Sequence, residues 1–142
     1  MKATVVEQDF AVAPQITPSD IADLAQEGIK TLINNRPDGE EPGQLTSADA
    51  RAQAEKLGLQ YVYLPVRTDA ITAAEVDAFA RALKSSPKPI LAHCRSGTRC
   101  YLLWAATQAI QGKDVSQLVM RAAGDGYDIR VLPDLLRRIG KG

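Results

Sequence analysis

Short runs of strand-forming residues alternate with helix-forming segments along this chain, and the alternation restricts its possible folds more than any other feature. Runs rich in β-branched and aromatic residues are expected to form strands at residues 5–13, 30–34, 59–66 and 89–94. The first run, residues 5–13, is expected to form either one strand or a hairpin. Segments that open with capping residues are expected to form helices; they cover residues 17–28, 46–58, 72–84 and 101–110, with two more from 114 and from 132. Strands separated by helices pair in parallel through right-handed crossovers. The sequence therefore predicts an α/β fold with a mainly parallel central sheet and helices on both faces.

Two of these helices begin with a capping pattern. Thr17 is a good N-cap, Pro18 stands at the first helical position, and Asp20 lies where a capping box needs its acceptor. Thr72 and Glu75 repeat the pattern before the third helix. We therefore expect each of these helices to start directly after its threonine.

Composition limits the partners that the chain can bind. Its 142 residues are the size of one domain, expected to span residues 1–142. Seventeen basic and seventeen acidic side chains cancel, so no nucleic-acid or membrane partner is expected, and any anion site must be local. No long apolar segment marks the N-terminus or a membrane span. The two cysteines form neither a disulfide framework nor a metal site, so a reducing, cytoplasmic setting without metal or cofactor is expected.

The stretch PILAHCRSGTRC, residues 89–100, carries the chemistry. Its strand should deliver Cys94 to the carboxyl edge of the sheet, where ligands bind in such folds. Ser96 and Gly97 are small, so the N–H groups of this loop can converge on a tetrahedral oxyanion at the start of the next helix. The same field is expected to lower the pKa of Cys94 into a range of roughly 3.5–7.5. Arg99 adds a planar guanidinium that can grip two oxygens.

Two neighbouring side chains complete this loop. Arg95 adds positive charge but is expected to point outward. His93, the only histidine, is expected to donate a hydrogen bond to the loop backbone rather than to act as a general base. The plainer alternative is a buried core cysteine followed by an ordinary turn. The closeness of a Cys, a Gly and an Arg at one strand-to-helix junction argues against it.

The loop resembles the active loops of two enzyme families. HCRSGTRC is similar to the phosphate-binding loop of cysteine-based protein tyrosine and dual-specificity phosphatases, although Arg99 follows Cys94 by five positions, where that pattern has six. CRSGTR also resembles the persulfide-carrying loop of single-domain rhodaneses. The Gly-His-Ile motif and the Gly-Gly…Trp tail of rhodaneses are absent. The segment LPVRTDAIT is similar to the general-acid region of dual-specificity phosphatases and puts Asp69 in the place of their acid.

A longer resemblance runs from about Gln15 to about Ile129. The segments PQITPSDIADLAQEGIKTLINNRPDGEEPGQ, YVYLPV, HCRSGTR and AGDGYDI are similar to the phosphatase-like domain of bacterial beta-lactamase-hydrolase-like proteins. This resemblance implies a protein-tyrosine-phosphatase-like α/β fold. Members of the family have been classed both as phosphatases and as sulfurtransferases, so the resemblance leaves the reaction open.

For phosphoryl transfer, each site residue has an expected role. Cys94 would attack phosphorus and form a thiophosphate intermediate, while the loop amides and Arg99 hold the equatorial oxygens. Asp69 would protonate the leaving oxygen and then activate water; the alternative is a loop aspartate favoured only by the dipole of the following helix. The residues expected to bind substrate follow two strand ends: Asn35, Arg36, Arg95, Ser96, Gly97 and Thr98. For the first two of these, loop scaffolding is an equal alternative.

Cys100 stands directly after the loop arginine, where the family usually has Ser. A hydroxyl there helps to expel the cysteine in the second step, and a thiol is a poor substitute, which predicts a slow second step. Cys100 could instead resolve an oxidised Cys94 as a disulfide. The third alternative is a small buried residue without a chemical role.

The favoured hypothesis is a metal-free, cysteine-dependent phosphatase that acts on a phosphorylated small molecule or a phosphoprotein. One alternative is a sulfurtransferase that carries a persulfide on Cys94, which the spacing of Arg99 favours and the missing rhodanese motifs oppose. A second is a low-turnover, anion-binding regulatory module. Neither the physiological substrate nor the oligomeric state follows from the sequence.

Overall fold

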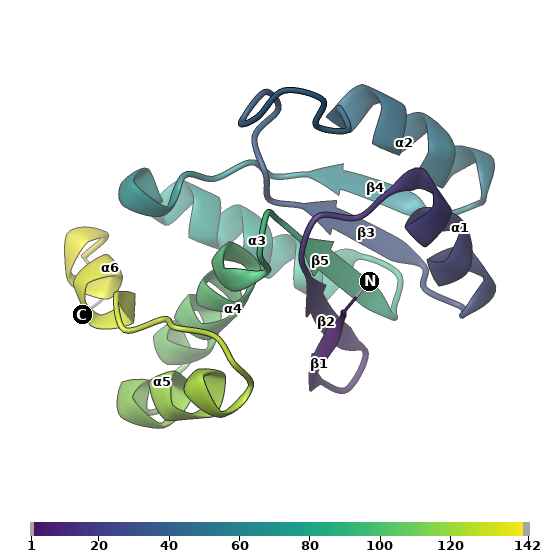
Figure 1. Cartoon of the computed structure of the whole chain (residues 1–142). Helices are drawn as coiled ribbons and strands as arrows, with labels where there is room; N and C mark the ends of the chain where they lie inside the picture. The colour runs from purple at the N-terminus through teal and green to yellow at the C-terminus, as the bar shows by residue number, and fades with distance from the viewer. Residues whose placement is uncertain (1, 141–142) are drawn as a thin grey trace.

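The computed structural model describes residues 2–140, and a five-stranded sheet runs through its centre (Figure 1). The strands are β1 (Thr4–Glu7), β2 (Phe10–Ala13), β3 (Thr31–Asn34), β4 (Gln60–Tyr63) and β5 (Ile90–His93). They lie in the order β1-β2-β5-β3-β4, with every pair parallel except the antiparallel pair β1 and β2. The predicted, mainly parallel sheet is confirmed. Residues 5–13, expected to form one strand or a hairpin, form the hairpin of β1 and β2.

Helices cover both faces of the sheet, as predicted. They are α1 (Pro18–Gln26), α2 (Ser47–Lys56), α3 (Ala73–Ser85), α4 (Thr98–Ile110), α5 (Val115–Gly124) and α6 (Leu132–Arg138), with a 3₁₀ turn at Thr68–Ala70 before α3. Helices α1 and α2 pack on one face, and α3 to α6 lie on the other (Figure 1). Within residues 2–140, no helix has the length and apolar content to cross a membrane.

Both predicted capping boxes are present. The Thr17 hydroxyl accepts a hydrogen bond from the backbone N–H of Asp20 at 3.1 Å, and the Asp20 carboxylate accepts one from the N–H of Thr17 at 2.9 Å. Thr72 and Glu75 make the same pair of bonds at 3.1 and 2.9 Å. Each helix therefore starts directly after its threonine, because the cap satisfies N–H groups that have no partner within the helix.

Helix α4 is the central helix of the larger core. Its residues from Cys100 to Thr107 are all buried, as expected for a helix that other elements surround. Tyr101 and Trp104 pack edge to face with ring centroids 5.7 Å apart, and the Trp104 indole N–H donates to the Glu7 carboxylate at 2.9 Å. A helix held on all sides gives the loop before it a rigid support.

Backbone hydrogen bonds beyond the strand ladders gather three loops at one edge of the sheet. The N–H of Cys94 donates to the Ala13 carbonyl at 3.3 Å, and the N–H of Asn35 donates to the His93 carbonyl at 2.8 Å. The N–H of Gln15 donates to the carbonyl of Arg95 at 3.1 Å. The loops after β2, β3 and β5 are therefore fastened to one another where the strands end.

Candidate active site

The loop from Cys94 to Arg99 turns sharply between β5 and α4. Gly97 makes this turn with a φ of 95°, in the left-handed region that favours glycine, and it is also the N-cap of α4. A Cβ at this position would lie 3.0 Å from the Tyr127 ring and 3.1 Å from its hydroxyl. Both the conformation and the lack of space call for glycine. This turn lets α4 begin at Thr98, ahead of its apolar run at 101–110.

The sulfur of Cys94 lies inside the loop. Its residue has no exposed surface, and the N–H of Gly97 donates to the sulfur at 3.0 Å. The pKa of Cys94 is lowered to about 5, first by a hydrogen bond with the Cys100 side chain and, against the opposing effect of burial, by the N–H groups of Cys100, Gly97 and Arg99. At neutral pH the residue is therefore a thiolate, the reactive form of cysteine.

Cys100 is the partner that matters most to this thiolate. It is fully buried in the first turn of α4, and burial raises its own pKa well above the usual value, so it stays a thiol and can donate its proton toward Cys94. The thiol occupies the position of the hydroxyl that was expected there. Both cysteines are free in this structure.

We expect Cys100→Ala to raise the pKa of Cys94, because the mutation removes the leading stabilising donor while the burial that opposes ionisation remains. Because the thiol ionises as pH rises, alkylation of Cys94 by iodoacetamide should begin at a higher pH in the variant. At a pH below both pKa values, each unit of upward shift leaves the variant with about tenfold less thiolate than the parent protein. Mass spectrometry of the alkylated protein across pH measures this. Cys100→Ser, which keeps a donor of similar size, should stay close to the parent protein, and an unshifted Ala profile would show that Cys100 does not control the thiolate.

Arg99 does not point freely into solvent but is clamped by Glu40. Its Nη1 donates to Glu40 Oε2 and its Nη2 to Glu40 Oε1, both at 2.8 Å, and Nη1 also donates to the Val66 carbonyl at 3.0 Å. Of the five guanidinium N–H groups, these bonds leave the Nε–H and the outer Nη2–H without a partner among residues 2–140. These two point in the same direction and form the second fork of the group, which can hold two oxygens of an anion.

Glu40 is held in turn by Arg36. The Nε of Arg36 donates to Glu40 Oε1 at 2.8 Å, its Nη2 to Glu41 at 3.0 Å and its Nη1 to the Gln15 side chain at 3.1 Å. Arg36 is only 1% exposed. The Arg99 bond, and after it the Arg36 bond, lowers the pKa of Glu40 to about 2 despite partial burial. A carboxylate that is ionised at neutral pH therefore fixes the orientation of Arg99.

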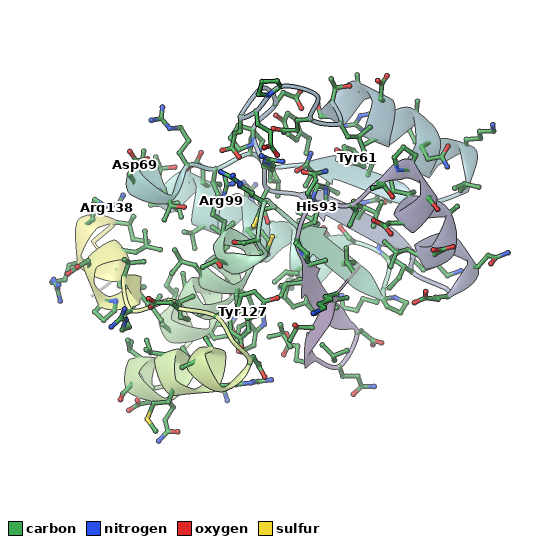
Figure 2. The ribbon with its side chains drawn as sticks, in the orientation of Figure 1. Tyr61, Asp69, His93, Arg99, Tyr127 and Arg138 are labelled. Atoms are coloured by element: carbon green, nitrogen blue, oxygen red, sulfur yellow. The ribbon has the colours of Figure 1, made fainter. Side chains whose placement is uncertain are left out.

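A cavity of about 530 Å³ opens beside the loop and brings several predicted site residues together. Its lining consists of Glu40, Arg67, Thr68, Asp69, Arg95, Ser96, Thr98 and Arg99. Asp69 stands on the 3₁₀ turn with its side chain 77% exposed and lies 3.8 Å from Arg67. Figure 2 shows the Asp69 turn and Arg99 on the same side of the molecule. Asp69 shares the cavity with the loop, and its role as the acid stays a prediction.

Asn35 and Arg36 lie at the predicted sheet edge but outside this cavity lining. Asn35 is fully buried, and its side-chain amide donates to the Leu64 carbonyl at 2.8 Å. The guanidinium of Arg36 donates its hydrogen bonds to Gln15, Glu40 and Glu41. Their observed contacts hold loops in place, which is the scaffolding alternative given above.

The hydrogen bond predicted from His93 to the loop backbone is not formed at ordinary hydrogen-bond geometry. The ring is 1% exposed, and neither ring nitrogen has a hydrogen-bond partner within residues 2–140. Burial lowers the pKa of His93 to about 4, and the nearby Cys94 backbone opposes this shift without the geometry of a bond. His93 is therefore neutral at pH 7, and its ring packs in the interior at the end of β5, directly before the loop.

Glu40 is the site residue that the sequence analysis missed. It lies in INNRPDGE, part of the long segment that resembles the family, and only Asn35 and Arg36 of this part were considered for the pocket. Tyr127 was also left without a role, and it supports the loop by packing against Gly97 and sharing a 3.2 Å hydrogen bond with Thr4. The resemblance of the segment containing INNRPDGE to the family was the one signal that could have pointed to Glu40.

These features place the molecule in a class. The crystal structure of a phosphatase candidate from Neisseria meningitidis is 34% identical and superposes with a TM-score of 0.83 over 94% of each chain. The active form of Tk-PTP, at 16% identity, has the same fold, with a TM-score of 0.73 over 96% of this chain and 95% of its own. The protein has a protein-tyrosine-phosphatase-like fold.

The sequence comparisons then give the family. The family model described as "Beta-lactamase hydrolase-like protein, phosphatase-like domain" matches residues 3–111. A beta-lactamase hydrolase-like protein of Xylella fastidiosa is 36% identical over 113 residues, which are 80% of this chain and 26% of the relative. The chain belongs to this phosphatase-like domain family, and it spans about a quarter of the length of the curated relatives that it matches.

Proposed function

We propose that this protein is a cysteine-dependent phosphatase that cleaves phosphate monoesters. The observation that carries the proposal is the buried Cys94 thiolate, with the Gly97 N–H 3.0 Å from its sulfur, beside a clamped Arg99 with one fork unoccupied. The membership of a phosphatase-like family supports the same reaction. The free cysteines agree with a reducing, cytoplasmic location.

In the first step, the Cys94 sulfur attacks phosphorus and the bond from phosphorus to the ester oxygen breaks. The fork of Arg99 and the loop amides hold the three oxygens that carry charge in the transition state. Asp69 gives its proton to the leaving oxygen, so the product departs as an alcohol. The intermediate carries the phosphoryl group on sulfur.

In the second step, water attacks the phosphorus and the bond to sulfur breaks. Asp69, now a carboxylate, takes the proton from water, and inorganic phosphate leaves. Cys94 returns to a thiolate that Gly97 and Cys100 stabilise, which makes it a good leaving group. The Cys100 thiol stands where the family usually has a serine hydroxyl, and because a thiol is the poorer donor the second step is still expected to be slow.

A pulse of aryl phosphate followed by intact-mass analysis tests this mechanism. An aryl leaving group departs without much help from an acid, whereas the second step still needs a base. Asp69→Asn should therefore accumulate a phosphate-sized adduct on Cys94, and Cys94→Ser should form none. Asp77→Asn, which changes an exposed aspartate on α3 that pairs with Arg81, is the matched control and should behave like the parent protein.

Sulfur transfer is the second candidate function, because Arg99 follows Cys94 one position earlier than in phosphatases. A parallel pulse with thiosulfate distinguishes the two. A sulfur-sized adduct without any phosphate adduct or phosphate release would overturn the phosphatase proposal. Absence of both adducts would leave a module that binds anions without turnover.

A further inference from the structure

The cavity beside the Cys94 loop has an unusual lining for a site that takes phosphotyrosine. Every residue of the lining is charged or carries a hydroxyl, and none is aromatic or aliphatic. Burying a phenyl ring against apolar walls is the main source of binding energy for an aryl group. Here such a ring would find no aromatic or aliphatic residue to pack against, only the carbon atoms of polar side chains.

Two arginines on this lining are not held by a strong ion pair. Arg95 is exposed and forms no ion pair within residues 2–140. Arg67 lies 3.8 Å from Asp69, and both side chains are more than two-thirds exposed, at 72% and 77%. An exposed pair at this distance contributes little. In the proposed first step Asp69 carries a proton, so Arg67 then has no counter-charge.

Glu40, the other acidic residue of the lining, adds no free negative charge to the cavity. Glu40 is bound by both Arg99 and Arg36, which neutralise it. Hydroxyl groups fill much of the remaining surface: Ser96 and Thr98 hydrogen-bond to each other at 3.0 Å, and Thr68 stands on the facing turn. Hydroxyls of this kind are suited to the hydroxyl groups of a sugar or polyol.

Resting on the function proposed above, we infer that the substrate is an aliphatic phosphate ester, such as a sugar or polyol phosphate, that carries a second phosphate group. The scissile phosphate occupies the Cys94 loop and the Arg99 fork. Arg67 and Arg95 hold the second phosphate at the mouth of the cavity, since guanidinium groups bind phosphate through paired, charge-assisted hydrogen bonds. Arg67 and Arg95 are then the residues that determine specificity.

The test compares esters that differ only in the second phosphate. We expect kcat/KM for fructose bisphosphate and glucose bisphosphate to exceed that for the matching monophosphates by about tenfold or more, the size of one charge-assisted interaction. Phosphotyrosine should be poorer than either bisphosphate. The double variant Arg67→Gln/Arg95→Gln should bring the bisphosphate-to-monophosphate ratio close to one. Arg130→Gln, at an exposed arginine outside this cavity, should leave the ratio unchanged.

The possible failures are distinguishable. If aryl phosphate forms the Cys94 adduct but neither bisphosphate is preferred, or phosphotyrosine is the best substrate, the inference is overturned and the proposed function stands. A preference that survives in the double variant also overturns the role of the two arginines. If no ester releases phosphate and no adduct forms on Cys94, the proposed function fails, and the inference fails with it.

Discussion

Arg99→Lys is expected to lower kcat/KM for an aryl phosphate by about a hundredfold to a thousandfold, the cost of losing a preorganised transition-state donor. The parent guanidinium bonds at once to Glu40 and the Val66 carbonyl and keeps a second fork for the substrate. A lysine ammonium is a point charge with three donors, so it cannot reproduce the planar fork while it pairs with Glu40. Steady-state kinetics measures the loss, and the intact-mass pulse should show slow adduct formation.

Arg130→Lys provides the matched control for this mutation. Arg130 also pairs with a carboxylate, that of Asp128 at 2.8 Å, but both are exposed and neither lines the cavity beside the loop. Kinetics close to those of the parent protein are expected. Nearly full activity of Arg99→Lys in a folded protein would contradict this role. Arg99 would then only stabilise the segment around Val66 through its hydrogen bond, and the loop amides alone would hold the phosphoryl oxygens.

Local sequence signals predicted the framework of the site well. The capping pairs of Thr17 and Thr72 depend on residues a few positions away, and both are present. The parallel order of β5 and β3 follows from the alternation of strands and helices, and it placed Asn35 at the same edge as Cys94. The small residues around Gly97 indicated the turn before α4.

Long-range contacts account for what the sequence did not reveal. Glu40 and Arg99 are 59 positions apart, and their pairing follows from the folded path of the loop after β3, which no spacing rule describes. Arg36 was expected either to bind substrate or to hold its loop, and the same loop folds over it and turns its charge inward. His93 was expected to hydrogen-bond to the loop backbone, and only the folded structure shows that neither ring nitrogen makes such a bond within residues 2–140.

Arg36→Met is expected to lower the free energy of unfolding by about 2–3 kcal/mol, because it removes charge-assisted bonds from a side chain that is 1% exposed. The cost stays below that of a fully buried pair, since Glu40 and Glu41 remain 27% and 48% exposed. Urea unfolding measures this loss. The control is Arg81→Met, at a 72% exposed arginine, which is expected to change stability by no more than about 0.5 kcal/mol.

A folded Arg36→Met protein should also lose activity, because Glu40 then has a single guanidinium to fix its position. If stability falls but kcat/KM is unchanged, Glu40 orients Arg99 without help, and Arg36 serves only to fasten the loop.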